Sequence, residues 1–428
     1  MGTARAPAPT VTFIDAYCAA YRDLFDDVRS FEHLCLLHLG LISDLPRKSL
    51  PAIGQRVGAD PQALHYFVAN ADWNLEKLRK KRLELTRDAL RERPFVLIID
   101  ETGDLKKGKT TDYVSRQYIG NLGTVDRGIV SVSAYGVLEN VTFPLRFQIF
   151  KPERCLKPDD TYQSKPTIAI DLVRQIVADG FKIQLVLADA LYGESGPFIH
   201  ALEALKLPYV VAIRENHSVL MPRSQRVRST RWRSFQRVFS DGREEKRYVR
   251  EVVFGKRRDV RYYELTSDPE KLPAATTRFV MTNMKGELRH TLGNCYGLRT
   301  WIEYGYKQSK NELGWTDYRL TDYHDIERWW ELVCSAYLMV SLQTSVLAPV
   351  AEAAPTTAPA TTVSNPSPVT QHPWWDPELS WKRTLNNLRL LIQPFCAACL
   401  LLPWMSVFPV PGLIEKLRYL IACINRST

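Results

Sequence analysis

Four side chains of different chemistry are spaced to fall along one face of a helix near residue 300. They are Tyr296, Arg299, Glu303 and Lys310. At about 100° per residue, this spacing places all four within one narrow stripe. A carboxylate between an arginine and a lysine suits a metal-binding acid flanked by phosphate-binding cations. The alternative is a solvated charged face joined by ion pairs one turn apart.

Two aspartates elsewhere each follow a run of apolar residues. Asp100 follows Phe95-Val-Leu-Ile-Ile99, and Asp189 follows Ile183-Gln-Leu-Val-Leu-Ala188. Such runs predict strands buried on both faces of a sheet. A carboxylate at this place is costly to leave unpaired, so each needs a hydrogen bond, a cation or a metal. One such aspartate alone is commonly a cap or turn residue, whereas two together with Glu303 favour a carboxylate site.

On these residues the chain resembles the DDE transposases, which have a ribonuclease H-like catalytic core. The motifs are Ile-Ile-Asp100-Glu-Thr-Gly, Leu-Ala-Asp189-Ala-Leu-Tyr-Gly and the spacing Tyr-x2-Arg-x3-Glu-x6-Lys. That spacing is the YREK signature of one cut-and-paste insertion-sequence branch. The resemblance covers about residues 94 to 340. It implies an α/β fold: a ribonuclease H-like mixed sheet with flanking helices, interrupted by a β-rich insertion.

The resemblance also implies roles for the three carboxylates. Asp100 would bridge two Mg²⁺ ions, Asp189 would hold one of them and Glu303 the other, and Mn²⁺ could substitute. Two ions about 3.5–4 Å apart activate an attacking oxygen and stabilise a leaving one. Glu101 and the lysines that follow it fit either DNA contacts or a solvated loop.

Cations of the same helix would bind DNA. By resemblance, Arg299 and Lys310 grip phosphates near the scissile bond, and Tyr296 hydrogen-bonds one. Lys307 lies on the same stripe and is a further candidate phosphate contact. Some relatives place a base-stacking tryptophan directly after the arginine, where Thr300 stands in this chain.

The chain is basic, and its positive charge is concentrated. Net charge is +10 and the pI is about 9.1, which favours a polyanionic partner. Residues 214–261 carry 15 Lys/Arg against 6 Asp/Glu. Residues 215–275 alternate as β-strands do and predict a separate antiparallel excursion, the insertion of the resembling family. Its candidate DNA contacts are Arg228, Arg231, Trp232 and Arg233.

The first 92 residues predict helices that bind DNA. Ser49 and Gly58 have the positions of an N-cap and a terminating glycine, and Asp60-Pro61 starts a second helix after a short turn. Residues 49–70 thus outline a helix-turn-helix. Its candidate base contacts are Gln62, His65 and Tyr66.

The expected organisation has six parts. These are an N-terminal helical domain at 1–92, the catalytic core at 93–214 and 276–347 around the insertion at 215–275, a flexible Ala/Pro/Thr/Ser-rich linker at 348–372, and a C-terminal helical module at 373–428.

Two features of the C-terminal module admit other interpretations. Residues 390–414 carry no charge, but four prolines are expected to break them into short buried or interface helices instead of a membrane span. Cys396-Ala-Ala-Cys399 has no second ligand pair nearby, so packed thiols are favoured over zinc. All eight cysteines lie far apart in a chain without a recognisable signal peptide, which predicts a reducing compartment.

The sequence therefore predicts a bacterial insertion-sequence transposase, acting as a homodimer on DNA in the cytoplasm at the nucleoid. It would bind terminal inverted repeats, nick the element ends and use each freed 3′-OH to attack target DNA. Two alternatives remain open: a transposase-derived, non-catalytic DNA-binding regulator, and a stand-alone metal-dependent DNA nuclease.

Overall fold

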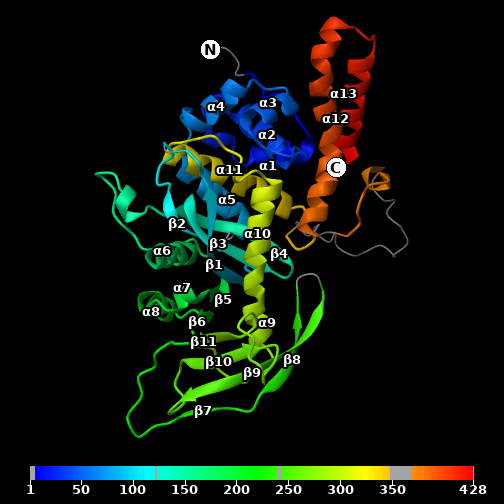
Figure 1. Ribbon diagram of the computed structural model, residues 1–428. Coiled ribbons are helices and arrows are strands. Elements are labelled where there is room, and N and C mark those ends of the chain that lie inside the picture. Colours follow the sequence, from blue (N-terminus) through cyan, green and yellow to red (C-terminus); the bar gives the residue numbers. More distant parts are fainter. Residues whose placement is uncertain are drawn as a thin grey trace. The chain divides into compact units, whose positions relative to one another are not determined.

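The computed structural model describes residues 5–108, 110–120, 123–239, 242–347, 368–378 and 380–427. The chain divides into two compact units (Figure 1). The sheet unit comprises Glu92–Lys109 and Tyr113–Tyr306. The helical unit comprises Met1–Arg91, Thr110–Asp112 and Lys307–Thr428.

The helical unit is built around α11 (Tyr323–Ser341), which is buried along nearly its whole length. Its other helical elements are α1 (Thr12–Ala19), η1 (Arg22–Leu24), α2 (Val28–Ile42), α3 (Leu50–Val57), α4 (Pro61–Ala69), α5 (Leu75–Leu90), η5 (Gln308–Glu312), η6 (Pro368–Gln371), α12 (Trp381–Val407) and α13 (Leu413–Ser427). Helices α2, α4, α5 and α12 all contact α11. Glu331 of α11 is fully buried and bonds to Arg79 and Arg82 of α5.

Local signals place α3 and α4 where the sequence predicts them. The Ser49 hydroxyl accepts a hydrogen bond from the Ala52 backbone, and Asp60 accepts one from the Gln62 backbone at 3.0 Å. Gly58 has a φ of 69°, the left-handed conformation that ends a helix. The candidate base contacts are solvent-exposed, and their role in binding DNA stays a prediction: Gln62, His65 and Tyr66.

Helix α12 corrects one part of the expectation that four prolines divide the C-terminal module, because only Pro409 and Pro411 separate helices there. It runs unbroken for 27 residues through Pro394 and Pro403. A proline removes one helical hydrogen bond but does not prevent continuation where the helix is held by packing. The start of α12 is held in this way, because the Trp381 Nε1 donates to the Ser341 hydroxyl of α11 at 3.0 Å. Helix α12 also contacts α3. Cys396 is buried within α12, and burial raises the pKa of that thiol to about 12.

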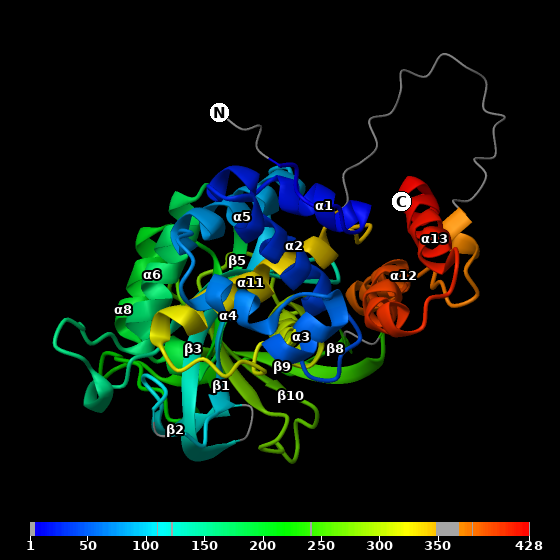
Figure 2. The same cartoon turned by 90° about the horizontal axis from the view of Figure 1, so that it is seen from above.

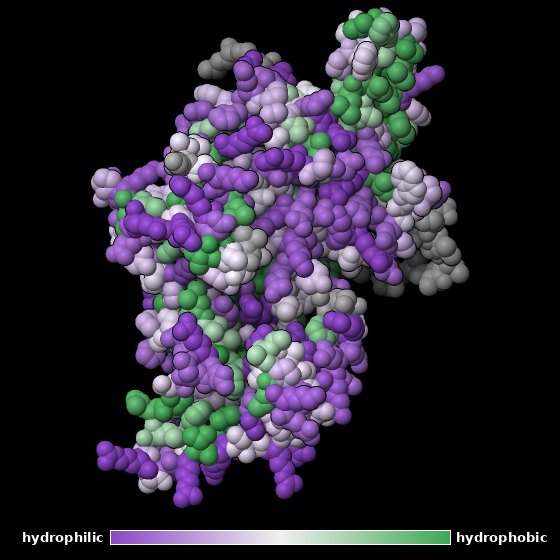
Figure 3. Space-filling model, in the orientation of Figure 1, coloured by the Kyte–Doolittle hydropathy of each residue, from purple (hydrophilic) through white to green (hydrophobic). Residues whose placement is uncertain are grey.

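The second half of α12 runs beside α13, and both expose apolar side chains (Figures 2 and 3). These include Leu402 and Trp404 of α12 and Tyr419 of α13, and Phe408 directly after α12 is exposed as well. By length and composition alone, α12 is the one helix in the described part of the chain that could cross a membrane, which is weak evidence for a membrane segment. Most of the predicted linker, 348–367, lies outside the described residues, and Pro368–Gln371 forms η6.

The sheet unit contains one large mixed sheet. Its strands are β1 (Phe95–Leu105), β2 (Ser115–Ile119), β3 (Thr124–Leu138), β4 (Val141–Ile149), β5 (Ile183–Ala188), β6 (Tyr209–Ile213), β7 (Val227–Ser229), β8 (Arg233–Val238), β9 (Glu244–Phe254), β10 (Arg261–Thr266) and β11 (Arg278–Thr282). In the order β4-β3-β1-β5-β6, β3 is antiparallel to both neighbours, and β1, β5 and β6 are parallel. This arrangement confirms the predicted ribonuclease H-like fold.

Helices cover both faces of that central sheet. Their bounds are η3 (Glu153–Cys155), α6 (Lys165–Ala178), α7 (Ala190–Gly193), α8 (Gly196–Ala204), α9 (Leu292–Gly297), η4 (Leu298–Thr300) and α10 (Trp301–Lys307). Side chains alternate along a strand, so Phe95 packs with the Phe181 ring on one face while Ile98 packs with Ile302 of α10 on the other. Asp100, two residues after Ile98, lies on the α10 face.

The basic insertion is not a separate excursion. Strand β11 pairs with both β6 and β10, so the sheet continues without interruption from the core into β10, β9 and β7. The sequence correctly predicts antiparallel strands in this segment but misses this junction. Without β11, the edge of β6 would present unpaired backbone groups, which explains why the strands join.

Candidate active site

Asp100 and Arg299 form an ion pair on the α10 face of the sheet. The Arg299 Nη1 donates to the Asp100 Oδ2 at 2.7 Å, and both side chains are largely shielded from solvent. Burial raises the pKa of Asp100 to about 7; Arg299 opposes this rise and the nearby Asp189 adds to it. Two carboxylates that repel each other in a buried place favour a cation between them.

Asp189 follows β5 directly and caps α7. Its Oδ1 accepts a hydrogen bond from the Leu191 backbone at 2.9 Å. Burial raises its pKa as well, against the charge of Arg299. At the other end of α7, a Cβ on Gly193 would lie 1.8 Å from the Ala212 carbonyl oxygen of β6. Only glycine allows α7 to pack this closely, and the packing fixes the capping aspartate.

Tyr192 links the two aspartate strands. Its hydroxyl donates to the Glu101 Oε2 at 3.1 Å, and the Lys165 Nζ of α6 donates to the Oε1 of the same carboxylate at 2.9 Å. Glu101 adjoins Asp100 and Tyr192 stands three residues after Asp189, so this bond ties α7 to β1 next to both aspartates, beside the pairing of Ile99 with Ala188. The sequence analysis missed Tyr192. Its position three residues after Asp189, in Asp-Ala-Leu-Tyr-Gly, could have pointed to it.

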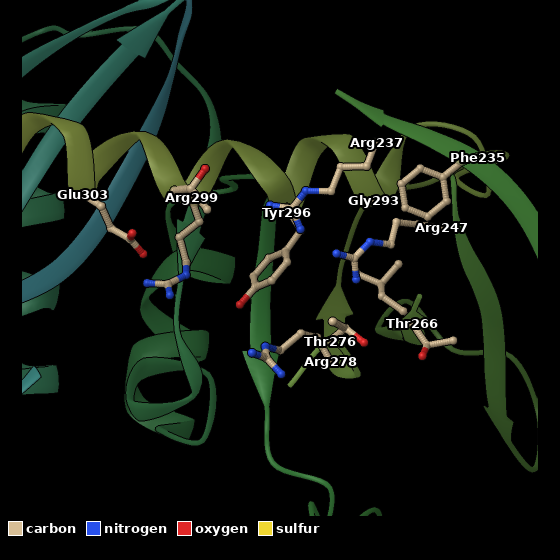
Figure 4. Close-up of a pocket in the computed structure, with 12 residues that line it drawn as sticks. Phe235, Arg237, Arg247, Thr266, Thr276, Arg278, Gly293, Tyr296, Arg299 and Glu303 are labelled. Carbon is tan, nitrogen blue, oxygen red and sulfur yellow. The ribbon is translucent and has the colours of Figure 1, made fainter. Parts of the chain in front are cut away.

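The helical segment opposite the sheet changes pitch. The predicted continuous α-helix is wrong in this detail, because Leu298–Thr300 is a 3₁₀ turn and Gln308–Glu312 a π turn. Tyr296, Arg299 and Glu303 still project from the same side of it (Figure 4). The other two candidate phosphate contacts, Lys307 and Lys310, belong to the helical unit.

The charge of Arg299 acts on all three candidate metal ligands. Although burial opposes it, the neighbouring Asp100, Asp189 and Glu303 raise the pKa of this guanidinium. In the described part of the chain, no three His, Cys, Asp or Glu side chains form a cluster that could hold one metal ion. The single charge of Arg299 thus offsets part of the negative charge of the carboxylates in this arrangement.

A cavity of about 230 Å³ adjoins Tyr296, Arg299 and Glu303 (Figure 4). Strands β8 and β9 of the insertion and the adjoining β11 contribute its other charged walls, which the sequence analysis did not single out: Arg237, Arg247 and Arg278. These arginines meet through the pairing of their strands, which a local sequence pattern does not predict.

The predicted contacts of the insertion lie elsewhere. Arg228 is exposed on β7 and donates to the Gly255 carbonyl at 3.1 Å. Trp232 is half-buried with the Arg250 guanidinium 4.4 Å from its ring. Arg231 and Arg233 are also exposed, so the DNA-binding role of this group stays a prediction.

Comparison with known proteins defines the class. A family model described as "DDE superfamily endonuclease" matches residues 23–265, more than half of the chain, including the positions of Asp100 and Asp189. The chain belongs to this superfamily and is a DDE transposase. It is 55% identical over 326 residues to the "Probable transposase for insertion sequence element IS701" of Microchaete diplosiphon, covering 76% of this chain and 86% of that protein. The family implies dependence on a divalent metal ion.

Proposed function

We propose that this transposase cleaves the ends of its insertion sequence at the Asp100, Asp189 and Glu303 site and joins them to target DNA. The observation that carries the proposal is that Asp100 and Asp189, both half-buried, directly follow the paired residues Ile99 and Ala188 of adjacent parallel strands, opposite the helix with Arg299 and Glu303. Each end is nicked by hydrolysis, and the freed 3′-OH attacks the target by transesterification.

The residues of the site fit two Mg²⁺ ions, or Mn²⁺ in their place. Carboxylate oxygens are the ligands that these hard cations prefer. Asp100 and Asp189 would hold one ion, and Asp100 and Glu303 the other. Bound metal supplies activation of the attacking oxygen and stabilisation of the leaving one. Arg299 exchanges the Asp100 carboxylate for a phosphate oxygen when DNA enters, because one guanidinium serves either anion.

The DNA contacts follow from charge and exposure. Tyr296, Arg299, Glu303 and Lys310 have the YREK spacing, which supports membership of that cut-and-paste branch. Tyr296, Arg299, Lys307 and Lys310 hold phosphates near the cleaved bond. The terminal inverted repeats contact α4 and the insertion, through Gln62, His65, Tyr66, Arg228, Arg231, Trp232 and Arg233. Two copies of the chain act on paired ends in the bacterial cytoplasm.

Incubation of the full chain with duplexes of its own element ends tests this function. We expect nicks at the element boundary and, with added plasmid, strand-transfer products, both dependent on Mg²⁺ or Mn²⁺ and lost with EDTA. Binding without any cleavage would instead support the non-catalytic regulator. Degradation of unrelated duplex at the same rate would support the stand-alone nuclease.

A further inference from the structure

Strand pairing gathers basic side chains on the face of the sheet that α9 covers. Phe235 of β8 stands opposite Arg247 of β9, and Leu265 of β10 stands opposite Arg278 of β11. Arg237 lies two residues after Phe235 and therefore on the same face. These five side chains line the cavity beside Tyr296 (Figure 4).

Arg237 and Arg247 of this cavity are poorly compensated, whereas the Arg278 guanidinium donates to nearby backbone carbonyls. The Nε atoms of Arg237 and Arg247 are buried and have no hydrogen-bond partner among the described residues. Glu245 accepts a hydrogen bond from Arg247 at 3.0 Å. Burial lowers the pKa of Arg237, and the charges of Arg247 and Arg278 lower it further, although Glu245 opposes this shift. Like charges that converge around unfilled donors are costly, and a bound anion relieves that cost.

We propose that this cavity binds a backbone phosphate of the DNA strand, next to the bond that is cleaved. Guanidinium groups present paired donors that match phosphate oxygens. The apolar walls Phe235 and Leu265 suit the sugar that carries the phosphate, which favours a nucleic acid strand over free phosphate. The location rests on the proposed function, because Glu303 marks the cleaved bond and lines the same cavity.

A scan with neutral phosphate replacements tests the site. Binding of a labelled element-end duplex is measured in EDTA, while each phosphate near the cleavage position is replaced in turn by methylphosphonate. We expect one replacement to weaken wild-type binding about tenfold. The same replacement should have no further effect on the Arg237→Gln/Arg247→Gln double variant, which already binds about tenfold more weakly. Equal losses from that replacement in both proteins would overturn the proposal.

A control variant distinguishes loss of this phosphate site from loss of positive charge in general. Arg174→Gln removes the same charge from an exposed position of α6 in the same unit and should leave the phosphate scan unchanged. Arg237→Gln alone should fold with an unchanged or higher melting temperature, since it removes a repulsive charge. In this single variant too, the methylphosphonate replacement that weakens wild-type binding should have no further effect. Free inorganic phosphate that competes as strongly as the duplex would overturn the assignment to a DNA strand. Wild-type protein that fails to bind the duplex would contradict the proposed function as well, whereas binding and coupling without cleavage in Mg²⁺ would contradict the proposed function alone.

Discussion

The Arg299 Nη1 lies 2.7 Å from the Asp100 Oδ2, although the two residues are 199 positions apart in the chain. The pair joins the middle of β1 to the helical turn that carries the YREK arginine. In the proposed reaction the same guanidinium must leave the aspartate for a phosphate, so the pair is an arrangement of the free protein. When metal and DNA bind together, Asp100 is then available to the metal and Arg299 to a phosphate.

The raised pKa of Asp100 makes stability depend on pH. The folded protein holds the Asp100 proton up to about pH 7, whereas the unfolded carboxyl releases it near 3.8. Stability is therefore lost as the pH rises between these values, by up to about 4 kcal/mol. Asp100→Asn, which stays neutral, should raise the melting temperature at pH 8 in EDTA far more than at pH 4. An equal effect at both pH values would show that Asp100 does not titrate in this range.

Gly193 should be needed for the position of Asp189. A Cβ there meets a backbone oxygen, which cannot swing away as a side chain can. Gly193→Ala should cost about 1–3 kcal/mol of unfolding free energy in urea denaturation and slow end cleavage. Gly196→Ala is the matched control, because a Cβ at Gly196 has no atom within 4 Å in the described structure. Equal stability of the two variants would contradict the close approach of α7 to β6.

Tyr192→Phe removes the hydroxyl that bonds to Glu101 and leaves the ring in place. The loss of one partner of a half-buried carboxylate should cost roughly 1–3 kcal/mol. If this bond sets the separation of the aspartates, the Mg²⁺ concentration for half-maximal cleavage should also rise. Tyr118→Phe, at an exposed position of β2, should change neither quantity. A change in stability without a change in Mg²⁺ dependence would limit Tyr192 to a structural role.

The buried ion pairs of the helical unit should dominate its stability. Glu331 is fully buried, and its carboxylate holds Arg79 and the fully buried Arg82. Glu331→Ala leaves both guanidinium groups without this partner and should cost about 3–5 kcal/mol in urea denaturation. Glu84→Ala removes a partly exposed partner of Lys81 and should cost less than about 1 kcal/mol. Similar losses from both variants would contradict the packing of α5 on α11.

The sequence correctly predicts strands before Asp100 and Asp189, because a long apolar run is a local signal. The expected end of the first strand is wrong, since β1 continues through Asp100 to Leu105 by pairing with β3. The same holds for α3 and α4, whose caps Ser49 and Asp60 are local signals. Continuation of α12 through Pro394 depends instead on its packing against other helices. The residues around Pro394 alone do not reveal that packing.

The site is predicted only in part for the same reason. Helical spacing correctly gathers Tyr296, Arg299 and Glu303, because they lie within eight residues of one another. Arg237 and Arg278 join them only through the pairing of strands that are distant in sequence. The pairing of β11 with β6, which a local pattern cannot specify, brings that part of the sheet to the core.

The most direct test of the proposed site compares single carboxylate variants in end cleavage with Mg²⁺. Asp100→Asn, Asp189→Asn and Glu303→Gln should each slow cleavage by roughly 1000-fold or more while binding the element end within about threefold of wild type. Asp171→Asn, on α6 away from the site, should cleave normally. Cleavage near the wild-type rate by any of the three site variants would contradict the assignment of these carboxylates to the active site.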